Sequence, residues 1–163
     1  MKSVLLDKSR HDRKRFDCGV KALNNYLQLM ASQQLKKDNT RTFILEDEQH
    51  PQFIKGYYSL TMTTIDLNAL PPRLRKKHQN ANSAGLIARL AVDRRYSRKG
   101  FGEWLLVDAL AKLLTASETV AFPFIIVDSK EGMAPFYEKF GFSSFLDTPD
   151  KLFITVADVR NIL

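Results

Sequence analysis

Two neighbouring stretches decide the fold: Leu86-Ile87-Ala88-Arg89-Leu90-Ala91-Val92 and, four residues later, Ser97-Arg98-Lys99-Gly100-Phe101-Gly102-Glu103. The first is an apolar run that predicts a strand, and the second opens a helical pattern of apolar residues. A basic turn with glycines between a strand and a helix is typical of a phosphate-binding loop. Glycine lets the backbone approach a ligand closely, and the first helical turn presents N–H groups without intrahelical partners.

The turn differs from two common nucleotide motifs. It lacks the third glycine of the dinucleotide pattern and the Gly-Lys-Ser/Thr of a nucleoside-triphosphate loop. We therefore expect a diphosphate cofactor gripped by backbone amides from Lys99 to Glu103, with Arg98 and Lys99 adding charge and no metal. An ordinary strand-to-helix connection, with glycines only for tight turning, remains an alternative interpretation of the turn alone.

Composition indicates one domain over residues 1–163. The chain is 44% hydrophobic and has no apolar run of the roughly 18 residues that a membrane span needs. The N-terminus does not resemble a secretory signal. Cys18 is the only cysteine, so it makes no internal disulfide, which favours a reducing cytoplasm. We expect Cys18 to be a small buried residue, and we expect the three scattered histidines on the surface with no metal site.

Apolar periodicity predicts a mixed α/β fold with one central β-sheet flanked by helices. The expected strands cover residues 4–6, 42–46, 53–62, 86–92, 122–127, 142–146 and 152–156. The expected helices cover residues 23–30, continuing or restarting towards Leu35, then 100–114 and 130–140, with a last short helix capped by Thr155. A short helical turn is expected within residues 67–74, around Pro71-Pro72. The stretch between residues 75 and 83 is expected to be a polar, mobile loop. The helix between strands 86–92 and 122–127 implies that those two strands are parallel.

The chain carries an excess of positive charge, and this charge is clustered. The formal net charge is +7, and three short stretches hold more than half of the 25 Lys and Arg residues. These stretches are Lys8, Arg10, Arg13, Lys14 and Arg15; Arg73, Arg75, Lys76 and Lys77; and Arg94, Arg95, Arg98 and Lys99. The phosphate-binding turn explains only the third. The other two indicate a larger polyanionic partner, unless they are simply solvated faces.

Several further pieces of sequence occur in a specific order. They are Phe16-Asp17-Cys18-Gly19, Gly56-Tyr57-Tyr58-Ser59-Leu60, Arg89-Leu90-Ala91-Val92-Asp93, Gly100-x-Gly102, Val127-Asp128 and Phe136-Tyr137-x-x-Phe140-Gly141-Phe142. In this combination the chain resembles the GNAT superfamily of acetyl-CoA-dependent N-acetyltransferases. It is also similar to one branch of that superfamily, the acetyltransferase toxins of bacterial toxin–antitoxin modules.

The resemblance implies an acetyl-CoA site and a catalytic residue. The cofactor-binding residues would be Leu90, Ala91, Val92, Ser97, Arg98, Lys99, Gly100, Phe101, Gly102, Glu103 and Phe136. Tyr137 matches the family's general acid, which donates to the leaving thiolate. Proton transfer from a free tyrosine to a thiolate is uphill by about 2 kcal/mol, so Tyr137 has a tuned pKa or mainly donates a hydrogen bond. Two positions depart from the pattern, because Ser97 replaces Gln or Arg and Lys130 replaces Asn.

The acceptor amine is constrained by its acidity. A lysine amine, with a pKa near ~10.4, needs a base, whereas an α-amine near ~8 is already partly neutral. Asp93, Glu103 and Asp128 are the only candidate bases, and each sits at a strand or helix end where a structural role is equally expected. An aminoacyl-tRNA acceptor therefore fits, as the toxin branch also implies. We expect contacts to tRNA from Arg73, Arg75, Lys76, Lys77, Arg89, Arg13 and Lys14.

The resemblance also implies partners. These are a cognate antitoxin with a ribbon-helix-helix part, operator DNA bound only through that antitoxin, and a second copy of the chain in a homodimer. Two alternatives remain open: an N-acetyltransferase for a small amine or a protein amine, and a non-catalytic nucleic-acid-binding module.

Overall fold

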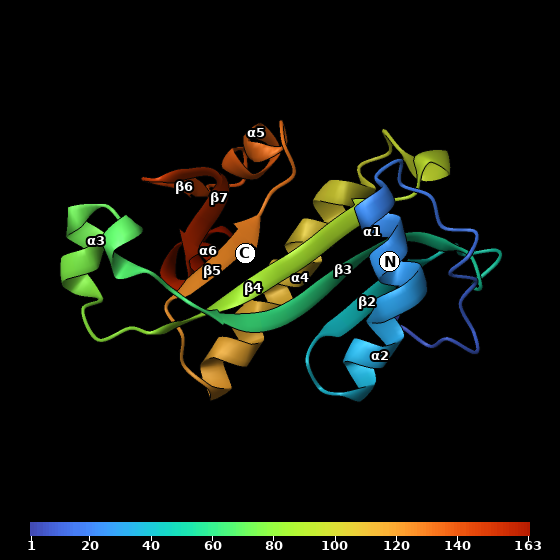
Figure 1. Cartoon of the computed structure of the whole chain (residues 1–163), viewed down its shortest axis with the longest axis horizontal. Coiled ribbons are helices and arrows are strands. Elements are labelled where there is room, and N and C mark those ends of the chain that lie inside the picture. Colours follow the sequence, from blue (N-terminus) through green and yellow to red (C-terminus); the bar gives the residue numbers. More distant parts are fainter. The chain divides into compact units, whose positions relative to one another are not determined.

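The computed structural model describes all 163 residues and contains one seven-stranded mixed sheet of order β1-β2-β3-β4-β5-β7-β6 (Figure 1). Helices flank the strands, which confirms the predicted fold class. The chain divides into two compact units, one of residues 1–61 and 88–109 and the other of residues 62–87 and 110–163. A single-domain organisation stays a prediction. No helix combines the length and apolar character of a membrane-spanning segment.

The first unit contains an antiparallel arrangement of β1 (Ser3–Leu5), β2 (Arg41–Glu46) and most of β3 (Ile54–Thr64). Val4 lies opposite Ile44, which in turn lies opposite Tyr57. Both Ile44 and Tyr57 are fully buried. The predicted edge strand and hairpin are confirmed.

A broken helix packs on this part of the sheet. It comprises α1 (Lys21–Asn25), a π-helical turn η1 (Tyr26–Met30) and α2 (Ala31–Lys36). Leu23, Tyr26 and Leu27 bury the predicted apolar stripe. The helix was predicted as one element or a restarted one, and the structure shows that the interruption is the wide turn at Tyr26–Met30.

Strand β4 (Ser83–Val92) leads through a 3-10 turn, η3 (Arg94–Tyr96), into the long helix α4 (Phe101–Thr119). The helix runs five residues past the predicted end at Leu114. The polar side chains of this extension are satisfied within the helix, since Thr115 donates to the Ala111 carbonyl at 3.1 Å and Ser117 donates to the Leu114 carbonyl at 2.6 Å. Polar residues therefore continue the helix after its apolar stripe has ended.

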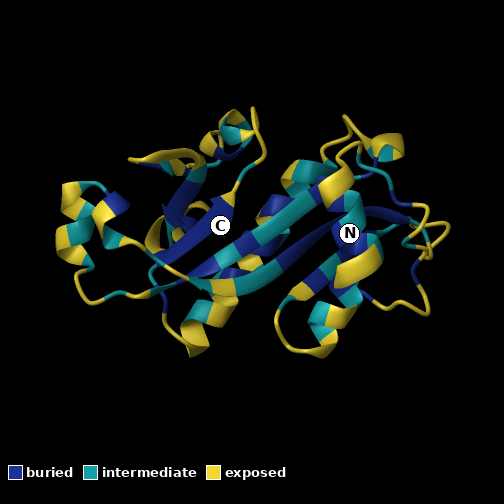
Figure 2. Ribbon diagram, in the orientation of Figure 1, coloured by how far each residue is buried: buried dark blue, intermediate teal, exposed yellow.

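The second unit contains β5 (Phe124–Asp128), β6 (Ser143–Phe145) and β7 (Thr148–Thr155). Strand β5 pairs parallel to β4, with Ala84 opposite Phe124 and Ile87 opposite Val127, as predicted. It pairs antiparallel to β7, and β6 forms the sheet edge. Figure 2 shows β5 as almost entirely buried, which explains its uninterrupted apolar sequence.

The short helices correct two predictions. They are η2 (Leu67–Ala69), α3 (Pro72–Lys77), α5 (Ala134–Glu138) and α6 (Val156–Ile162). The helical turn expected around Pro71-Pro72 is confirmed, but the expected loop at residues 75–83 is wrong in its first part, because the helix that starts at Pro72 continues to Lys77. The expected helix at 130–140 is too long, because Gly132 has a φ of +82° and Pro135 lies in the first turn of α5. Thr155 caps α6 as predicted, accepting the Asp158 N–H at 3.0 Å.

His11 is not a surface residue, contrary to expectation. Only 4% of it is exposed. Its Nδ1 accepts the Asp7 N–H at 3.0 Å, so its Nε2–H donates to Glu46 Oε2 at 2.7 Å. Cys18 is half-buried against the core of the first unit, and burial raises the pKa of its thiol. It therefore stays protonated at neutral pH, in keeping with a packing role.

Candidate active site

A buried carboxylate anchors the turn that follows β4. Asp93 is 1% exposed, and its carboxylate accepts hydrogen bonds from the Asp17 and Arg95 backbone N–H groups and from the Arg95 guanidinium, at 2.9–3.0 Å. Burial opposes its ionisation, but these hydrogen bonds outweigh burial and lower the Asp93 pKa. Asp93 is therefore committed to holding the turn, which disfavours it as the base for the acceptor amine.

The phosphate loop, residues 97–103, has the backbone shape that anion binding requires. Arg98 and Gly100 both have positive φ angles, of 61° and 81°. Gly100 accepts the Trp104 N–H at 3.1 Å, so α4 begins at Phe101 and the first-turn N–H groups point beyond the helix end. Successive N–H groups in such a backbone form an anion-binding concavity, and the Arg98 and Lys99 side chains are exposed beside it.

Ser97 does not substitute for the usual Gln or Arg. Its hydroxyl donates to the Arg94 carbonyl at 2.9 Å and closes the preceding 3-10 turn. The Ser97 hydroxyl is thus engaged within the turn, and a side-chain contact from Arg98 or Lys99 to a diphosphate stays a prediction. Glu103 lies in the first turn of α4, and it is exposed.

A second set of side chains packs against the phosphate loop at Phe101. The sequence did not predict these contacts. The Tyr96 hydroxyl donates to Asp47 Oδ2 at 2.8 Å, and the Tyr96 ring packs edge-on against Phe101. Lys55 is 5% exposed, and its ammonium lies 4.3 Å from the centre of the Phe101 ring and 4.0 Å from a Glu48 carboxylate oxygen. The available signal was a lysine inside the otherwise uncharged strand Ile54–Thr64.

The strand segment predicted to face the acetyl group lies at the end of β4. Ala91 is buried in the core of the first unit, whereas Leu90 and Val92 are half-buried. Gly56 allows close packing here, because a Cβ on it would lie 2.8 Å from the Ala91 carbonyl oxygen and 2.7 Å from Leu105 Cδ1. The role of Leu90, Ala91 and Val92 in binding the cofactor stays a prediction.

Tyr137 lies in α5 within an aromatic cluster. It is 5% exposed, and its ring packs edge-on against Phe136 and Phe142 with centroids 5.0 and 5.7 Å apart. Gly141, with a φ of +97°, reverses the chain so that the Phe142 N–H bonds to the Tyr137 carbonyl at 3.3 Å. Burial raises the Tyr137 pKa to about 12. The phenol therefore keeps its proton throughout the physiological range and is available as a donor.

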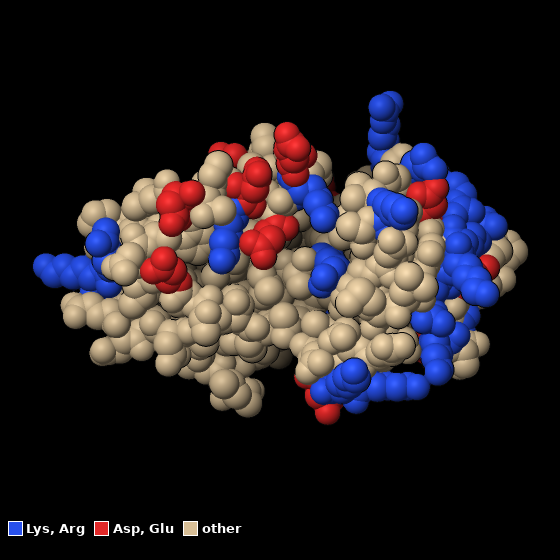
Figure 3. All heavy atoms as spheres, in the orientation of Figure 1, with Lys and Arg blue, Asp and Glu red and all other residues tan.

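The first and third basic groups meet in one groove of the first unit. Its lining includes the cations Lys14, Arg15, Lys21, Arg94 and Arg95. Figure 3 shows Lys and Arg atoms gathering over the N-terminal segment that contributes to this groove. Two of the cations are engaged, because Arg94 pairs with Asp17 and Arg95 pairs with Asp93 and donates to the Arg15 carbonyl.

Arg13, another predicted RNA contact, lies outside the residues that line this groove and donates to the Gln28 carbonyl at 3.4 Å. Arg89, the predicted contact on β4, stacks on an aromatic ring of the broken helix, Tyr26.

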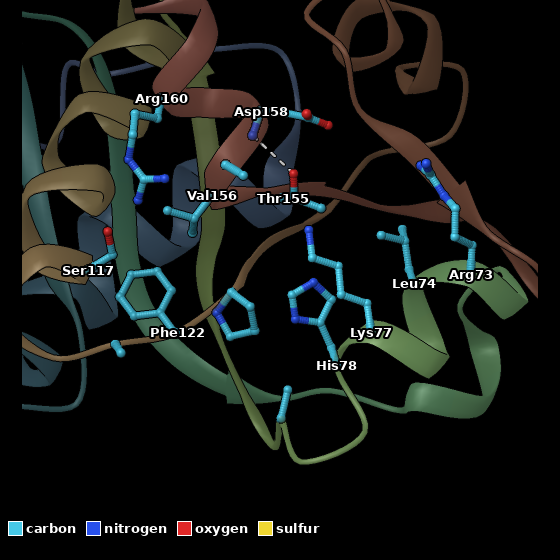
Figure 4. Close-up of a pocket in the computed structure, with 14 residues that line it drawn as sticks. Arg73, Leu74, Lys77, His78, Ser117, Phe122, Thr155, Val156, Asp158 and Arg160 are labelled. Carbon is cyan, nitrogen blue, oxygen red and sulfur yellow. Dashed lines mark hydrogen bonds between the residues drawn. The ribbon is translucent and has the colours of Figure 1, made fainter.

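The second basic group lies in the other unit, on α3. Arg73 and Lys77 line a pocket of about 660 Å³ together with His78, and Arg160 reaches it from α6 (Figure 4). Lys76 is exposed outside this lining. Arg75 turns towards the protein interior, where its Nη2 lies 3.5 Å from the Leu70 carbonyl oxygen. Of the four predicted α3 contacts, two therefore share a concave surface.

Comparison with known proteins decides the family. The family model described as acetyltransferase (GNAT) domain matches residues 17–151, which include β4, the phosphate loop and Tyr137. The chain belongs to the GNAT acetyltransferase family. It is therefore an N-acetyltransferase, and acetyl-CoA is the acetyl donor that this family uses.

Three GNAT relatives illustrate the similarity. The probable toxin TacT of Sinorhizobium fredii is 25% identical over 168 residues, covering 97% of this chain and 92% of the relative. A tRNA-acetylating toxin of Mycobacterium tuberculosis is 26% identical, covering 91% and 88%. The solved structure of AtaT complexed with acetyl-methionyl-tRNAfMet superposes with a TM-score of 0.90 at 26% identity, covering 99% of this chain and 98% of that one.

The phosphate loop of this GNAT chain fits a coenzyme A diphosphate. Arg98 and Gly100 have positive φ angles, and Arg98 and Lys99 are exposed cations. Helix α4 starts directly after them, at Phe101. A diphosphate bound here would be held mostly by backbone N–H groups, so such binding does not depend on a Gln or Arg side chain at Ser97.

Proposed function

We propose that the chain is a toxin that transfers the acetyl group of acetyl-CoA to the α-amino group of an aminoacyl-tRNA and thereby blocks translation in the cytoplasm. The observation that carries this proposal is the basic groove beside the turn that leads into the phosphate loop. Clusters separated by about eighty residues of sequence converge there, which supports a partner with a continuous phosphate backbone. The names of the relatives, a tRNA-acetylating toxin and a complex with acetylated tRNA, support the same acceptor.

The proposed acetyl-CoA site uses the phosphate loop for the diphosphate, and it uses Leu90, Ala91 and Val92, with Phe136, for the remainder of the donor. Acetyl-CoA supplies an activated thioester. Backbone N–H groups at the end of β4 would stabilise negative charge on the carbonyl oxygen as the neutral amine attacks. This arrangement needs no metal ion.

Tyr137 is proposed as the residue that assists the leaving thiolate. Full proton transfer from a phenol with a pKa of about 12 to a thiolate, whose conjugate acid titrates near ~8.5, is uphill by about 5 kcal/mol. Burial makes this transfer costlier than it would be for a free tyrosine. Tyr137 therefore acts chiefly as a hydrogen-bond donor that stabilises the thiolate. As the new C–N bond forms and the C–S bond breaks, the amine nitrogen loses one proton, and this proton, not that of Tyr137, ends on the thiolate to give free coenzyme A.

None of the three candidate bases is both buried and uncommitted, since Glu103 is exposed, and this favours an α-amine acceptor. Asp93 is held by Arg95, and Asp128 is an exposed residue at the end of β5. An α-amine on an aminoacyl ester is partly neutral at pH 7 and can attack without a protein base, whereas a lysine amine cannot. The proposal extends to a cognate antitoxin of ribbon-helix-helix type, to operator DNA bound through that antitoxin, and to a homodimer.

The deciding experiment is acetyl transfer from radiolabelled acetyl-CoA to total charged tRNA, with uncharged tRNA, spermidine and a protein N-terminal peptide as parallel acceptors. We expect label only in charged tRNA, and we expect mild alkaline hydrolysis of the aminoacyl ester to release it as an N-acetylamino acid. Label in spermidine or the peptide but not in tRNA would select the small-amine or protein-amine alternative.

A further inference from the structure

Arg89 lies beside the proposed reaction centre and has no anionic partner. It is half-buried on β4, one residue before the Leu90–Val92 segment. Its guanidinium carbon lies 3.7 Å from the centre of the Tyr26 ring. The Arg89 guanidinium forms no hydrogen bond and no ion pair in the structure, and besides this stacking it acts electrostatically on the Tyr57 hydroxyl.

The stacking platform is rigid. Tyr26 is 3% exposed and begins the π-helical turn η1. Its hydroxyl is hydrogen-bonded to Thr40 Oγ1 at 2.8 Å, so the far end of the ring is fixed as well. The ring therefore holds the guanidinium plane in one orientation and leaves its N–H donors uncommitted.

Four other arginines of the same unit are neutralised, whereas Arg13, Arg15 and Arg98 form no ion pair. Arg10 pairs with Glu46, Arg41 with Asp38, Arg94 with Asp17 and Arg95 with Asp93. Arg89 acts electrostatically on the buried Tyr57. The other titratable groups that act on Tyr57 are Cys18 and Tyr26, and neither is a carboxylic acid that could compensate the Arg89 guanidinium. A half-buried cation without such compensation costs stability unless a ligand supplies the anion.

We propose that Arg89 binds the phosphate on the 5′ side of the 3′-terminal nucleotide of the acceptor RNA, and so selects aminoacyl-RNA over free amines. This inference rests on the proposed function. A guanidinium held flat presents paired donors that match two phosphate oxygens. In a terminal nucleotide that phosphate is one ribose away from the esterified amino acid, so a phosphate at Arg89 directs the α-amine towards the neighbouring Leu90–Val92 segment. The same fixed charge repels polyamine and lysine ammonium groups.

The test uses two stable acceptors that differ only in this phosphate. Both are 3′-deoxyadenosine carrying an amide-linked amino acid on a 3′-amino group, one with and one without a 5′-phosphate, and the amino acid is the one acetylated on charged tRNA. With the wild-type enzyme we expect removal of the phosphate to lower kcat/KM by about 10- to 100-fold, as for other charged hydrogen bonds. With Arg89→Gln we expect the two acceptors to react equally.

Matched variants separate this role from a structural one. Arg41→Gln removes the same charge from an exposed arginine of β2 and should keep the full phosphate effect. Arg89→Lys keeps the charge without the planar fork and should retain part of the effect. Acetyl-CoA affinity should be the same in all folded variants. The wild-type comparison alone keeps the inference testable if Arg89→Gln does not fold.

The outcomes distinguish failure of the inference about Arg89 from failure of the proposed function. If wild type acetylates charged tRNA and both small acceptors at equal rates, the inference about Arg89 is wrong and the proposed function stands. If wild type acetylates no RNA-derived acceptor while it acetylates spermidine or a peptide, the proposed function is wrong and the inference is wrong with it.

Discussion

The Tyr96 hydroxyl donates a 2.8 Å hydrogen bond to the Asp47 carboxylate and thereby joins the turn before the phosphate loop to the β2–β3 connection. Asp47 is itself fixed, since it also accepts the Gln49 and His50 N–H groups at 2.9 Å. These bonds, with that from Tyr96 the largest contributor, lower the Asp47 pKa. The loop that grips the cofactor is therefore anchored to a part of the chain about fifty residues away in sequence.

Tyr96→Phe tests this anchor. We expect a loss of about 1 kcal/mol in the free energy of unfolding at pH 7, because the phenyl ring keeps the packing and only the hydrogen bond is lost. The folded-state pKa of Asp47 is depressed, so the contribution of the bond is present above the unfolded pKa of an aspartate and disappears as pH falls through the lower folded pKa. Urea denaturation of both proteins at pH 7 and at pH 3 should show the difference shrinking. An equal difference at both pH values would contradict the role of the carboxylate.

Asp93→Asn distinguishes a structural carboxylate from a catalytic base. Asparagine cannot accept all the hydrogen bonds that Arg95 and the Asp17 N–H now donate, so we expect a loss of about 2–3 kcal/mol in the free energy of unfolding. The pH profile of kcat/KM should keep its shape in whatever fraction remains folded. If the variant instead keeps its stability and loses the acidic limb of that profile, Asp93 is the base.

Gly100 is required for its backbone conformation rather than for space. Its φ is +81°, and a Cβ built on it meets no atom within 4 Å. Gly100→Val should therefore weaken acetyl-CoA binding strongly by displacing the loop, because a β-branched residue is strained at positive φ by about 1–2 kcal/mol or more. Gly100→Asn is the matched control, because asparagine tolerates this conformation. Calorimetry should find acetyl-CoA affinity nearly intact in the Asn variant and greatly reduced in the Val variant, and equal affinities would contradict the conformational role.

The sequence predicted the elements that depend on short-range patterns. The parallel pair of β4 and β5 followed from two apolar runs with a helix between them, and the cap at Thr155 followed from local spacing. The truncation of α5 was missed, although Gly132 and Pro135 lie within the predicted span.

Long-range partners were not predictable from one sequence. The brace of Tyr96 on Asp47, the burial of His11 against Glu46 and the stacking of Arg89 on Tyr26 each join residues that are far apart along the chain. Periodicity reports which face a residue occupies and carries no information on which distant side chain it meets there.

Tyr137→Phe tests the proposed donor to the leaving thiolate. The phenol is 5% exposed and sits between aromatic rings, so phenylalanine should preserve the fold and acetyl-CoA affinity. We expect kcat to fall about 100-fold or more, as for loss of a positioned acid or hydrogen-bond donor. Because burial raises the Tyr137 pKa to about 12, wild-type activity should show no decline attributable to this group between pH 7 and about pH 10. Near-normal turnover in the variant would remove Tyr137 from the mechanism.

Lys14 and Lys21 test the groove as a contact for RNA phosphates. Both lysines line the groove and neither forms an ion pair, so replacing each with glutamine should leave the fold undisturbed. The replacement should reduce the number of counterions that the RNA releases on binding. In the double variant we expect the slope of log K against log salt concentration for charged tRNA to become shallower by about 2, with affinities converging at high salt. Lys37→Gln, at the end of α2 and outside the groove, is the control for lost net charge. A double variant with the wild-type slope would show that the RNA backbone lies elsewhere, because only a contacted cation changes the number of ions released on binding.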